Sequence, residues 1–281
     1  WSAWLRLIRL RNQTGTALLL LPTCWSLVLA ERGLPAPRLL GIFLAGSFLM
    51  RRAGVVLNDL ADQSFDRHVA RTKTRPLASG ELSRGQAALL LVFLLLAAVG
   101  LLLFLNPLTM VLAPVALALA ALYPFAKRFV HIPQAMLGLA FGWGTIMAWT
   151  ASRGTIDPPA WTVFGATILW AIAYDTIYAI QDQEDDRRIG VKSAALFFGP
   201  SIWLAVGVTL GAMLLLLAAA GLQTGAGWPY FLMLGAVSVF FAMQVRILRG
   251  AISPTQAFQM FQAHVWAGVA ILLGLVAGFL V

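Results

Sequence analysis

Charged residues are scarce in this sequence. Lys, Arg, Asp and Glu make up only 11% of its 281 residues, whereas hydrophobic residues make up 60%. A soluble domain carries roughly 25% charged residues, so this composition argues against a water-soluble fold. The mean hydropathy of +0.84 points the same way. We therefore expect an integral membrane protein.

Cysteine and histidine are also rare. The single cysteine, Cys24, excludes an internal disulfide and any zinc site built on several cysteines, and we interpret it as a small apolar helix residue. The three histidines, His68, His131 and His264, are not spaced as metal ligands and are interpreted as structural. Carboxylates remain as the candidate metal ligands.

Long apolar runs are abundant. A helix crosses a bilayer with about 20 apolar residues, and continuous runs favour helices over barrel strands, which alternate. Nine runs have this character: 14–31, 39–58, 86–105, 108–124, 133–151, 160–181, 203–221, 228–248 and 262–281. We predict an all-α polytopic membrane protein that forms one domain over residues 1–281. About nine transmembrane helices are expected to surround a central intramembrane chamber.

The segment before the first run allows two interpretations. Trp1, Trp4, Leu5 and Ile8 share one helical stripe, and the arginines fall off it. This pattern suits a helix lying in the membrane interface, but a plain juxtamembrane tail fits equally well. The sequence starts at Trp1 instead of methionine, which leaves room for an upstream segment.

The net charge of +9 follows membrane topology rather than a nucleic-acid surface. If the nine helices alternate, fifteen of the twenty Lys and Arg residues fall on one side and three on the other, while Arg51 and Arg52 lie within a span. The positive-inside rule makes the rich side cytoplasmic, or the matrix side in a mitochondrion. We expect a bacterial inner membrane, with the mitochondrial inner membrane as the alternative, and no nucleic-acid partner.

Acidic residues gather on the same side, which the positive-inside rule does not explain. They concentrate in two stretches, NDLADQSFDRHVARTKTRPLASG at 58–80 and YDTIYAIQDQEDDRRIGVKS at 174–193. Each stretch ends a long apolar run, and four helices separate the two. This arrangement predicts a weak internal repeat of helices 1–4 and 5–8, with the ninth helix added. Such repeats commonly form a site at their interface.

Each stretch spaces its carboxylates along one helical face. The first set is Asp59, Asp62 and Asp66, and the second is Asp175, Asp182 and Asp186, with Tyr178 between them. Asp175 lies roughly 10 Å deeper than Asp182, where a carboxylate costs about 3 kcal/mol to place. The carboxylate faces and the deep position of Asp175 both indicate a functional role.

Mg²⁺ is the cation that best accounts for two converging carboxylate faces. It is satisfied by one or two carboxylates plus phosphate oxygens, so the pattern predicts a diphosphate bound through metal. Nearby cations that can neutralise the remaining charge are Arg71, Lys73, Arg75, Arg187, Arg188 and Lys192. The alternative, a solvated loop in which acids and bases pair off, suits one such stretch better than two at equivalent positions.

The two stretches resemble a known family. NDLADQSFD fits the N-D-x-x-D-x-x-x-D signature of the UbiA-type aromatic prenyltransferases, and DQEDD fits their second motif, D-x-x-x-D. FLMRRAGVV and ALYPFAKRFVHIPQAMLGLAFGWG extend the resemblance to the 4-hydroxybenzoate polyprenyltransferase branch. The resemblance covers about a third of the chain, and the family's nine transmembrane helices agree with the nine runs.

The resemblance implies a reaction and roles for the carboxylates. A polyprenyl diphosphate is ionised, and its allylic carbon is attached to 4-hydroxybenzoate ortho to the hydroxyl, in ubiquinone or related quinone synthesis. Two Mg²⁺ ions are expected, one held by Asp59, Asp62 and Asp66 and the other by Asp182 and Asp186. Asp62 and Asp182 are expected to be indispensable for catalysis. Asp175 is expected to support the chemistry or to accept the ring proton.

The resemblance also suggests substrate contacts. Arg51 lies seven residues before Asn58, on the same face and deep in the second helix, and is expected to bind the aromatic carboxylate rather than to snorkel. Arg52, on another face, fits a membrane anchor. In the family, a Tyr and a Lys at the positions of Tyr123 and Lys127 lie near the two substrates. The other expected substrate-binding residues are Asn58, Tyr178, Arg71, Lys73, Arg75 and Lys192.

The sequence departs from the family pattern at one position. The family often has Pro two residues before the glycine that matches Gly15, where this sequence has Gln13. The departure leaves open the local shape at the start of the first span and whether Arg11 or Asn12 touches substrate.

The two rival functions are another UbiA-type enzyme, of the haem, menaquinone, tocopherol or chlorophyll pathways, and a cation-coupled transporter.

Overall fold

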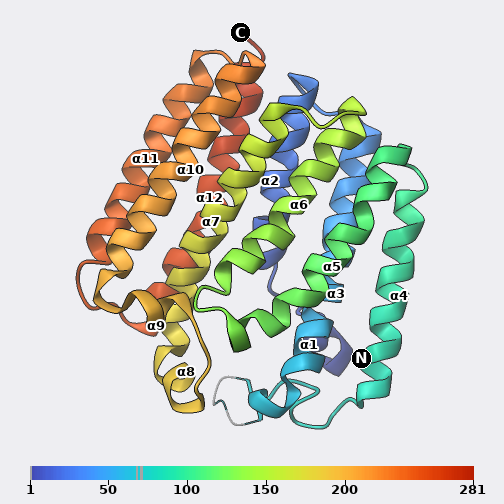
Figure 1. Ribbon diagram of the computed structural model, residues 1–281, viewed down its shortest axis with the longest axis vertical. Helices are drawn as coiled ribbons and strands as arrows, with labels where there is room; N and C mark the ends of the chain where they lie inside the picture. The colour runs from blue at the N-terminus through green and yellow to red at the C-terminus, as the bar shows by residue number, and fades with distance from the viewer. Residues whose placement is uncertain (1, 68, 70–71) are drawn as a thin grey trace.

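The structure is a bundle of long helices (Figure 1). It is a computed structural model that describes residues 2–67, 69 and 72–281, without the side chains of Lys127 and Ile189. In this part of the chain the elements are helical: α1 Ser2–Leu7, α2 Thr14–Glu31, α3 Pro37–Asp66, α4 Arg84–Leu102, α5 Pro107–Phe129, α6 Gln134–Arg153, α7 Pro158–Ala179, η1 Ile180–Asp182, α8 Gln183–Ile189, α9 Ala194–Phe198, η2 Gly199–Ser201, α10 Ile202–Thr224, α11 Trp228–Ile247 and α12 Pro254–Gly278.

The membrane helices follow the apolar runs. Each of the nine predicted spans lies largely within one long helix of the described chain. Among the described residues, eight helices are long and apolar enough to cross a bilayer. The ninth, α6, has 20 residues, which is long enough to span, and it packs between α2, α5 and α7. The all-α membrane fold is therefore confirmed.

Two predicted boundaries were too narrow because polar residues continue the helices. α3 runs on from residue 58 to Asp66, so the whole first acidic motif is helical. α12 begins at Pro254 rather than at residue 262, and the Ser253 side chain caps it. Ser83 accepts a hydrogen bond from the Gln86 backbone N–H and completes a capping box that starts α4.

α7 forms the centre of the bundle, against α6, α10 and α12. Small residues allow the closest approach: a Cβ added at Gly138 of α6 would lie 2.8 Å from Ile168 Cα. Trp170 Nε1 donates a 2.9 Å hydrogen bond to Nδ1 of His264, which is fully buried among aromatic rings. This environment agrees with the structural interpretation of His264.

The N-terminal segment folds back onto the bundle. Leu7 of α1 is fully buried in a cluster with Ala53 of α3 and Leu77 of the following loop, and Trp4 packs against the same cluster. The chain then turns at Arg9, whose φ is +50°. The segment is therefore docked on the protein, which a plain juxtamembrane tail does not describe, and a helix lying in the membrane interface stays a prediction.

Both acidic stretches lie at the same end of the bundle, as helix alternation predicts. In Figure 1, α1, α8 and the loop between α3 and α4 meet at the lower end, and the C-terminus lies at the upper end. The internal repeat of helices 1–4 and 5–8 stays a prediction.

Candidate active site

A long cavity runs through the bundle between α2, α3, α4, α5, α6 and α7, with α12 at one side. Its volume is about 540 Å³. On α3 it is lined from Ile42 to Asn58, sixteen residues that rise roughly 24 Å. Most of its wall is apolar, with Leu, Ala, Met and Phe side chains. The cavity can therefore hold a long apolar molecule away from water.

Polar groups gather at one end of this chamber. Arg51 and Asn58 of α3 line it, as their shared face predicted, together with Asp175 of α7 and Tyr123 of α5. Asp175 lies within electrostatic range of Arg51 and of Asp182. A cation and a carboxyl group therefore share the inner part of this polar end.

Arg51 has room for its side chain because residue 15 is glycine. A Cβ added at Gly15, in the first turn of α2, would lie 2.4 Å from Arg51 Nη2 and 2.6 Å from Nε. The guanidinium group therefore rests on the bare backbone of α2. This contact sets where the Arg51 charge lies in the chamber.

Aromatic rings form one wall of the polar end. Tyr178 lines the chamber, and its ring centroid lies 4.7 Å from Phe261 and 6.3 Å from Phe258 of α12. Tyr174, one turn earlier on α7, lines it as well. The two phenylalanines were not predicted from the sequence, because nothing in α12 alone shows that it reaches the chamber.

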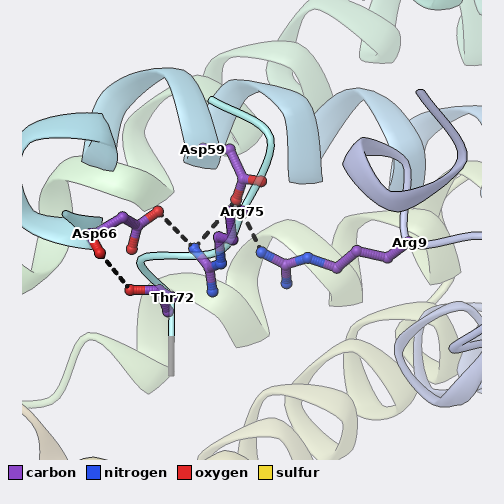
Figure 2. A network of polar contacts seen from close by, with 5 residues as sticks. All are labelled: Arg9, Asp59, Asp66, Thr72 and Arg75. Carbon is purple, nitrogen blue, oxygen red and sulfur yellow. Dashed lines mark hydrogen bonds and ion pairs between the residues drawn. The ribbon is translucent and has the colours of Figure 1, made fainter. Parts of the chain in front are cut away.

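The first acidic motif holds two arginines in a network that Figure 2 shows. Arg9 Nη2 donates to Asp59 Oδ1 at 2.8 Å. Arg75 Nη1 donates to the same Asp59 oxygen at 3.2 Å and to Asp66 Oδ2 at 2.7 Å. Thr72 Oγ1 donates to the Asp66 backbone oxygen at 3.0 Å, which ties the loop to the end of α3. The network joins the N-terminal segment, α3 and the following loop.

Arg9 is a charged residue of the site that the sequence did not indicate. It was counted only among the basic residues that set topology. Its role depends on the docked α1 segment, and no periodicity in a short tail predicts where that tail folds. Asp59 itself is only 2% exposed, so a contact with Arg9 requires the tail to reach inside the bundle.

The second acidic motif departs from one regular helical face. α7 ends at Ala179, residues 180–182 form a 3₁₀ turn, and α8 continues from Gln183. The predicted face through Asp175, Asp182 and Asp186 is therefore interrupted, because a 3₁₀ turn winds more tightly than an α-helix. Asp182 and Asp186 are half-buried, and Asp62 of the first motif is buried.

The predicted basic residues differ in whether they reach the carboxylates. Arg75 reaches the carboxylates, but Lys73 is exposed in the loop. Lys192 Nζ donates to the Phe129 backbone oxygen at 2.9 Å and so ties the loop after α8 to the end of α5. Arg71 and the side chain of Lys127 lie outside the described part of the chain.

Arg52 is not an anchor at the membrane surface. It is 1% exposed, and its guanidinium donates to Gln13 Oε1 at 2.8 Å and to Thr16 Oγ1 at 3.0 Å. The anchor interpretation was wrong because the start of α2 covers this face of α3. Gln13, at the position where the family often has Pro, thus supplies a side-chain hydrogen-bond acceptor that proline lacks.

The carboxylates fit Mg²⁺ in their chemistry. Among the described residues, no three His, Cys, Asp or Glu side chains form a metal site by themselves. Mg²⁺, however, needs only one or two carboxylates plus phosphate oxygens. Arg75 occupies the position of a shared cation between Asp59 and Asp66, which shows that this pair draws positive charge between its oxygens.

Comparisons with known proteins place the chain in context. The model of the UbiA prenyltransferase family matches residues 19–251. A 4-hydroxybenzoate octaprenyltransferase of Alkalilimnicola ehrlichii is 46% identical over 270 residues, which cover 96% of this chain and 92% of the relative.

Solved structures share the fold. A UbiA homolog from Aeropyrum pernix K1 superposes with a TM-score of 0.78 at 23% identity, over 96% of this chain and 98% of that one. A UbiA homolog from Archaeoglobus fulgidus bound to GPP and Mg²⁺ has a TM-score of 0.68 at 18% identity, over 98% of this chain and 99% of that one.

Proposed function

Because this chain belongs to the UbiA prenyltransferase family, we propose that it transfers a polyprenyl group from polyprenyl diphosphate to 4-hydroxybenzoate, ortho to the hydroxyl. The relative of that activity at 46% identity supports this substrate pair. The observation that carries the proposal is the shape of the chamber. One long apolar cavity ends where Arg51, Asn58 and Asp175 lie beside the acidic motif.

The apolar part of the chamber suits the prenyl chain. Burying a hydrocarbon tail along α3, α4 and α5 is favourable, at roughly 25 cal/mol per Å² of apolar surface. The same walls keep water from the allyl cation that forms when the diphosphate leaves. Apolar side chains such as Leu95, Leu117 and Phe141 line this part.

The acidic motifs suit the diphosphate through Mg²⁺. We assign Asp59, Asp62 and Asp66 to one ion and Asp182 and Asp186 to a second. Bound Mg²⁺ supplies positive charge that neutralises the leaving diphosphate. Arg9 and Arg75 lie beside the first set and can donate charge-assisted hydrogen bonds to phosphate oxygens once metal takes their place. Arg71, Lys73 and Lys192 are further candidates from the loops.

The inner polar end suits the aromatic acid. Arg51 is assigned to its carboxylate, because a guanidinium pairs with a carboxylate in bidentate fashion. Tyr123 and Tyr178 border the same space, and Lys127 follows Tyr123 by one turn. Asp175 supports the chemistry from the opposite helix or accepts the ring proton.

The bacterial source of the relative favours the bacterial inner membrane, with a role in ubiquinone or related quinone synthesis. We place both acidic motifs on the cytoplasmic side, where the positive-inside rule puts the basic loops. Protease cleavage of the loop between α3 and α4 in oriented inner-membrane vesicles tests this orientation.

The test of the function is direct. Purified protein in detergent is incubated with radiolabelled 4-hydroxybenzoate, a series of prenyl diphosphates and Mg²⁺, and the product is identified by mass spectrometry and NMR. We expect an ortho-prenylated acid that forms only with Mg²⁺. No product from 4-hydroxybenzoate, but product from haem or a naphthoate, a homogentisate or a chlorophyllide acceptor, would assign another branch of the family. Family membership disfavours the cation-coupled transporter, which makes no product.

A further inference from the structure

A second hollow lies on a different face of α3 from the acidic motif. Its volume is about 450 Å³, and it shares no lining residue with the chamber. We call it the arginine groove. Its described lining residues are Leu60, Ala61, Gln63, Ser64, Arg67, Arg84, Phe125 and Arg128. Nothing in the proposed reaction uses it.

Three elements each contribute one arginine to this groove. Arg67 follows the end of α3, Arg84 begins α4, and Arg128 lies in the last turn of α5. Two of them are held in place. Arg84 Nη1 donates to Gln63 Oε1 at 3.3 Å, and Arg128 Nη2 donates to the Ala61 backbone oxygen at 3.1 Å. Two of the three cations of the groove are therefore positioned by hydrogen bonds.

Aromatic rings strengthen this placement. The Arg128 guanidinium carbon lies 5.1 Å from the centre of the Phe125 ring and 5.4 Å from that of Phe65. Both distances fall within the range of a cation–π contact. Arg128 is thus fixed between α3 and α5 by a hydrogen bond and two rings.

Among the described residues, no carboxylate compensates the charge of the groove. The described lining residues include no Asp or Glu. In the part of the chain that the structure describes, the ion pairs involve Arg6, Arg9 and Arg75, and none of the three groove arginines. Three like charges around one hollow repel one another, so an anion bound there is favoured.

The position of the arginine groove at the ends of membrane-spanning helices indicates a lipid as its ligand. The three helices are long and apolar enough to cross a bilayer, and the arginines lie just after the end of α3, at the start of α4 and in the last turn of α5. All three arginines thus lie at a membrane boundary, at the level of lipid headgroups. Large apolar side chains continue from the groove along α5, where Leu122 is 56% and Phe125 is 40% exposed. This surface suits acyl chains, and α4 stands at the edge of the bundle (Figure 1).

We propose that the arginine groove binds the phosphate group of an anionic phospholipid, whose acyl chains lie along α4 and α5. Basic pockets between transmembrane helices recognise anionic headgroups in this way. A free phosphate has the same charge chemistry, but it makes no use of the apolar flank. The groove lies outside the chamber, so this proposal stands or falls independently of the prenyl acceptor.

The test measures lipid binding rather than activity. Wild type, Arg84→Gln and Arg128→Gln are reconstituted with phosphatidylglycerol and phosphatidylcholine, and the retained lipid is identified by native mass spectrometry. We expect wild type to retain phosphatidylglycerol in preference. Each substitution is expected to weaken that binding about fivefold, as a change of about 1 kcal/mol per arginine implies. Arg84→Lys keeps the charge and is expected to restore most of the binding.

The matched control is Arg246→Gln, which removes an exposed arginine near the end of another membrane helix, α11. It is expected to bind phosphatidylglycerol as wild type does. An equal loss in this control, or no lipid preference in wild type, would overturn the proposal. Displacement of the lipid by millimolar inorganic phosphate, with phosphate binding in phosphatidylcholine alone, would also overturn it in favour of a soluble-anion site. Thermal unfolding of each variant shows whether a loss reflects misfolding.

Discussion

Arg51 and Arg52 are neighbours in the sequence and lie in different surroundings. Arg51 lines the chamber against the backbone of Gly15, whereas Arg52 is buried under the start of α2. Successive residues on a helix point about 100° apart, so one turn of α3 presents one cation to the chamber and buries the other against α2. The predictions on substrate binding therefore concern single side chains.

Replacing Arg51 is expected to affect the aromatic substrate most. If Arg51 pairs with the benzoate carboxylate, Arg51→Ala raises the KM for 4-hydroxybenzoate by roughly 10- to 150-fold, the equivalent of about 1.5–3 kcal/mol. Arg51→Lys recovers only part of the binding, because lysine lacks the planar fork. Steady-state kinetics with each substrate varied in turn measures the effect. A defect confined to the prenyl diphosphate KM would assign Arg51 to the diphosphate instead.

Gly15→Ala is expected to act like a mild form of the Arg51 substitution. The new Cβ would overlap the Arg51 guanidinium, and the end of a flexible side chain moves before the backbone does. We expect a higher KM for 4-hydroxybenzoate with little change in Tm. Gly41→Ala, where an added Cβ meets nothing within 4 Å, is the control. Normal kinetics in Gly15→Ala would show that the precise position of Arg51 is unimportant.

Arg9 offers a test of the docked N-terminal segment. Arg9→Ala removes one cation from Asp59 and is expected to lower kcat/KM for the prenyl diphosphate by about tenfold or more, since a charge-assisted hydrogen bond contributes about 1.5–3 kcal/mol. Arg11→Ala removes an exposed arginine two residues away that does not line the chamber, and it serves as the control. If both variants lose the same activity, the effect is one of general surface charge.

At the scale of whole elements, the start of α2 holds the site together. Gln13 precedes the first turn, Thr16 lies within it, and both accept hydrogen bonds from Arg52 of α3. The Arg52 guanidinium carbon also lies 4.3 Å from the centre of the Phe48 ring. These contacts join α2 and α3 next to Gly15, so the alignment of the two helices also positions Arg51.

Gln13→Ala is expected to destabilise the protein because it leaves Arg52 Nη2 buried without this acceptor. The loss of a partner for a buried polar group costs about 1–3 kcal/mol, which lowers the apparent Tm by a few degrees. Thermal unfolding in detergent measures the change. Gln223→Ala, which removes an exposed hydrogen bond with Thr162, is expected to leave the Tm almost unchanged. An unchanged Tm in Gln13→Ala would show that water replaces the lost acceptor.

At the scale of the whole molecule, the two acidic motifs lie at the same end of the bundle because the long helices of the described chain alternate in direction (Figure 1). Each motif lies at the end of a helix that also lines the chamber, α3 for the first and α7 for the second. The two acidic motifs and the apolar chamber are thus built on the same two helices. Substitutions in either motif are expected to stop the same reaction.

Asp59→Ala, Asp62→Ala and Asp182→Ala are each expected to lower turnover at least 100-fold while the protein stays folded. Metal-assisted charge stabilisation contributes several kcal/mol to such a reaction, and every 1.4 kcal/mol is tenfold. Chelation of Mg²⁺ by EDTA is expected to do the same to wild type, with recovery on adding Mg²⁺.

The control for this prediction is Glu31→Gln, which alters an exposed carboxylate on the C-terminal residue of α2, at the far end of the bundle from the motifs. Its turnover and Mg²⁺ demand are expected to match wild type. A motif variant with near-normal turnover and unchanged Mg²⁺ demand would remove that aspartate from the metal site.

The sequence by itself determined the membrane class, the helix positions and the two acidic motifs. These features depend on local properties: the length of an apolar run, and carboxylates repeated at helical spacing. Arg51 and Asn58 could also be placed together, because a helical face follows from residue numbers alone. The end of the bundle that carries both motifs follows from counting spans.

Only the tertiary structure decided which distant segments touch. Arg9 reaches Asp59 across fifty residues because α1 docks on α3 and its loop. Arg52 is buried because α2 covers it, and the arginine groove exists because the ends of α3, α4 and α5 meet. None of these contacts leaves a periodic signal, since each depends on how helices pack rather than on how one helix winds.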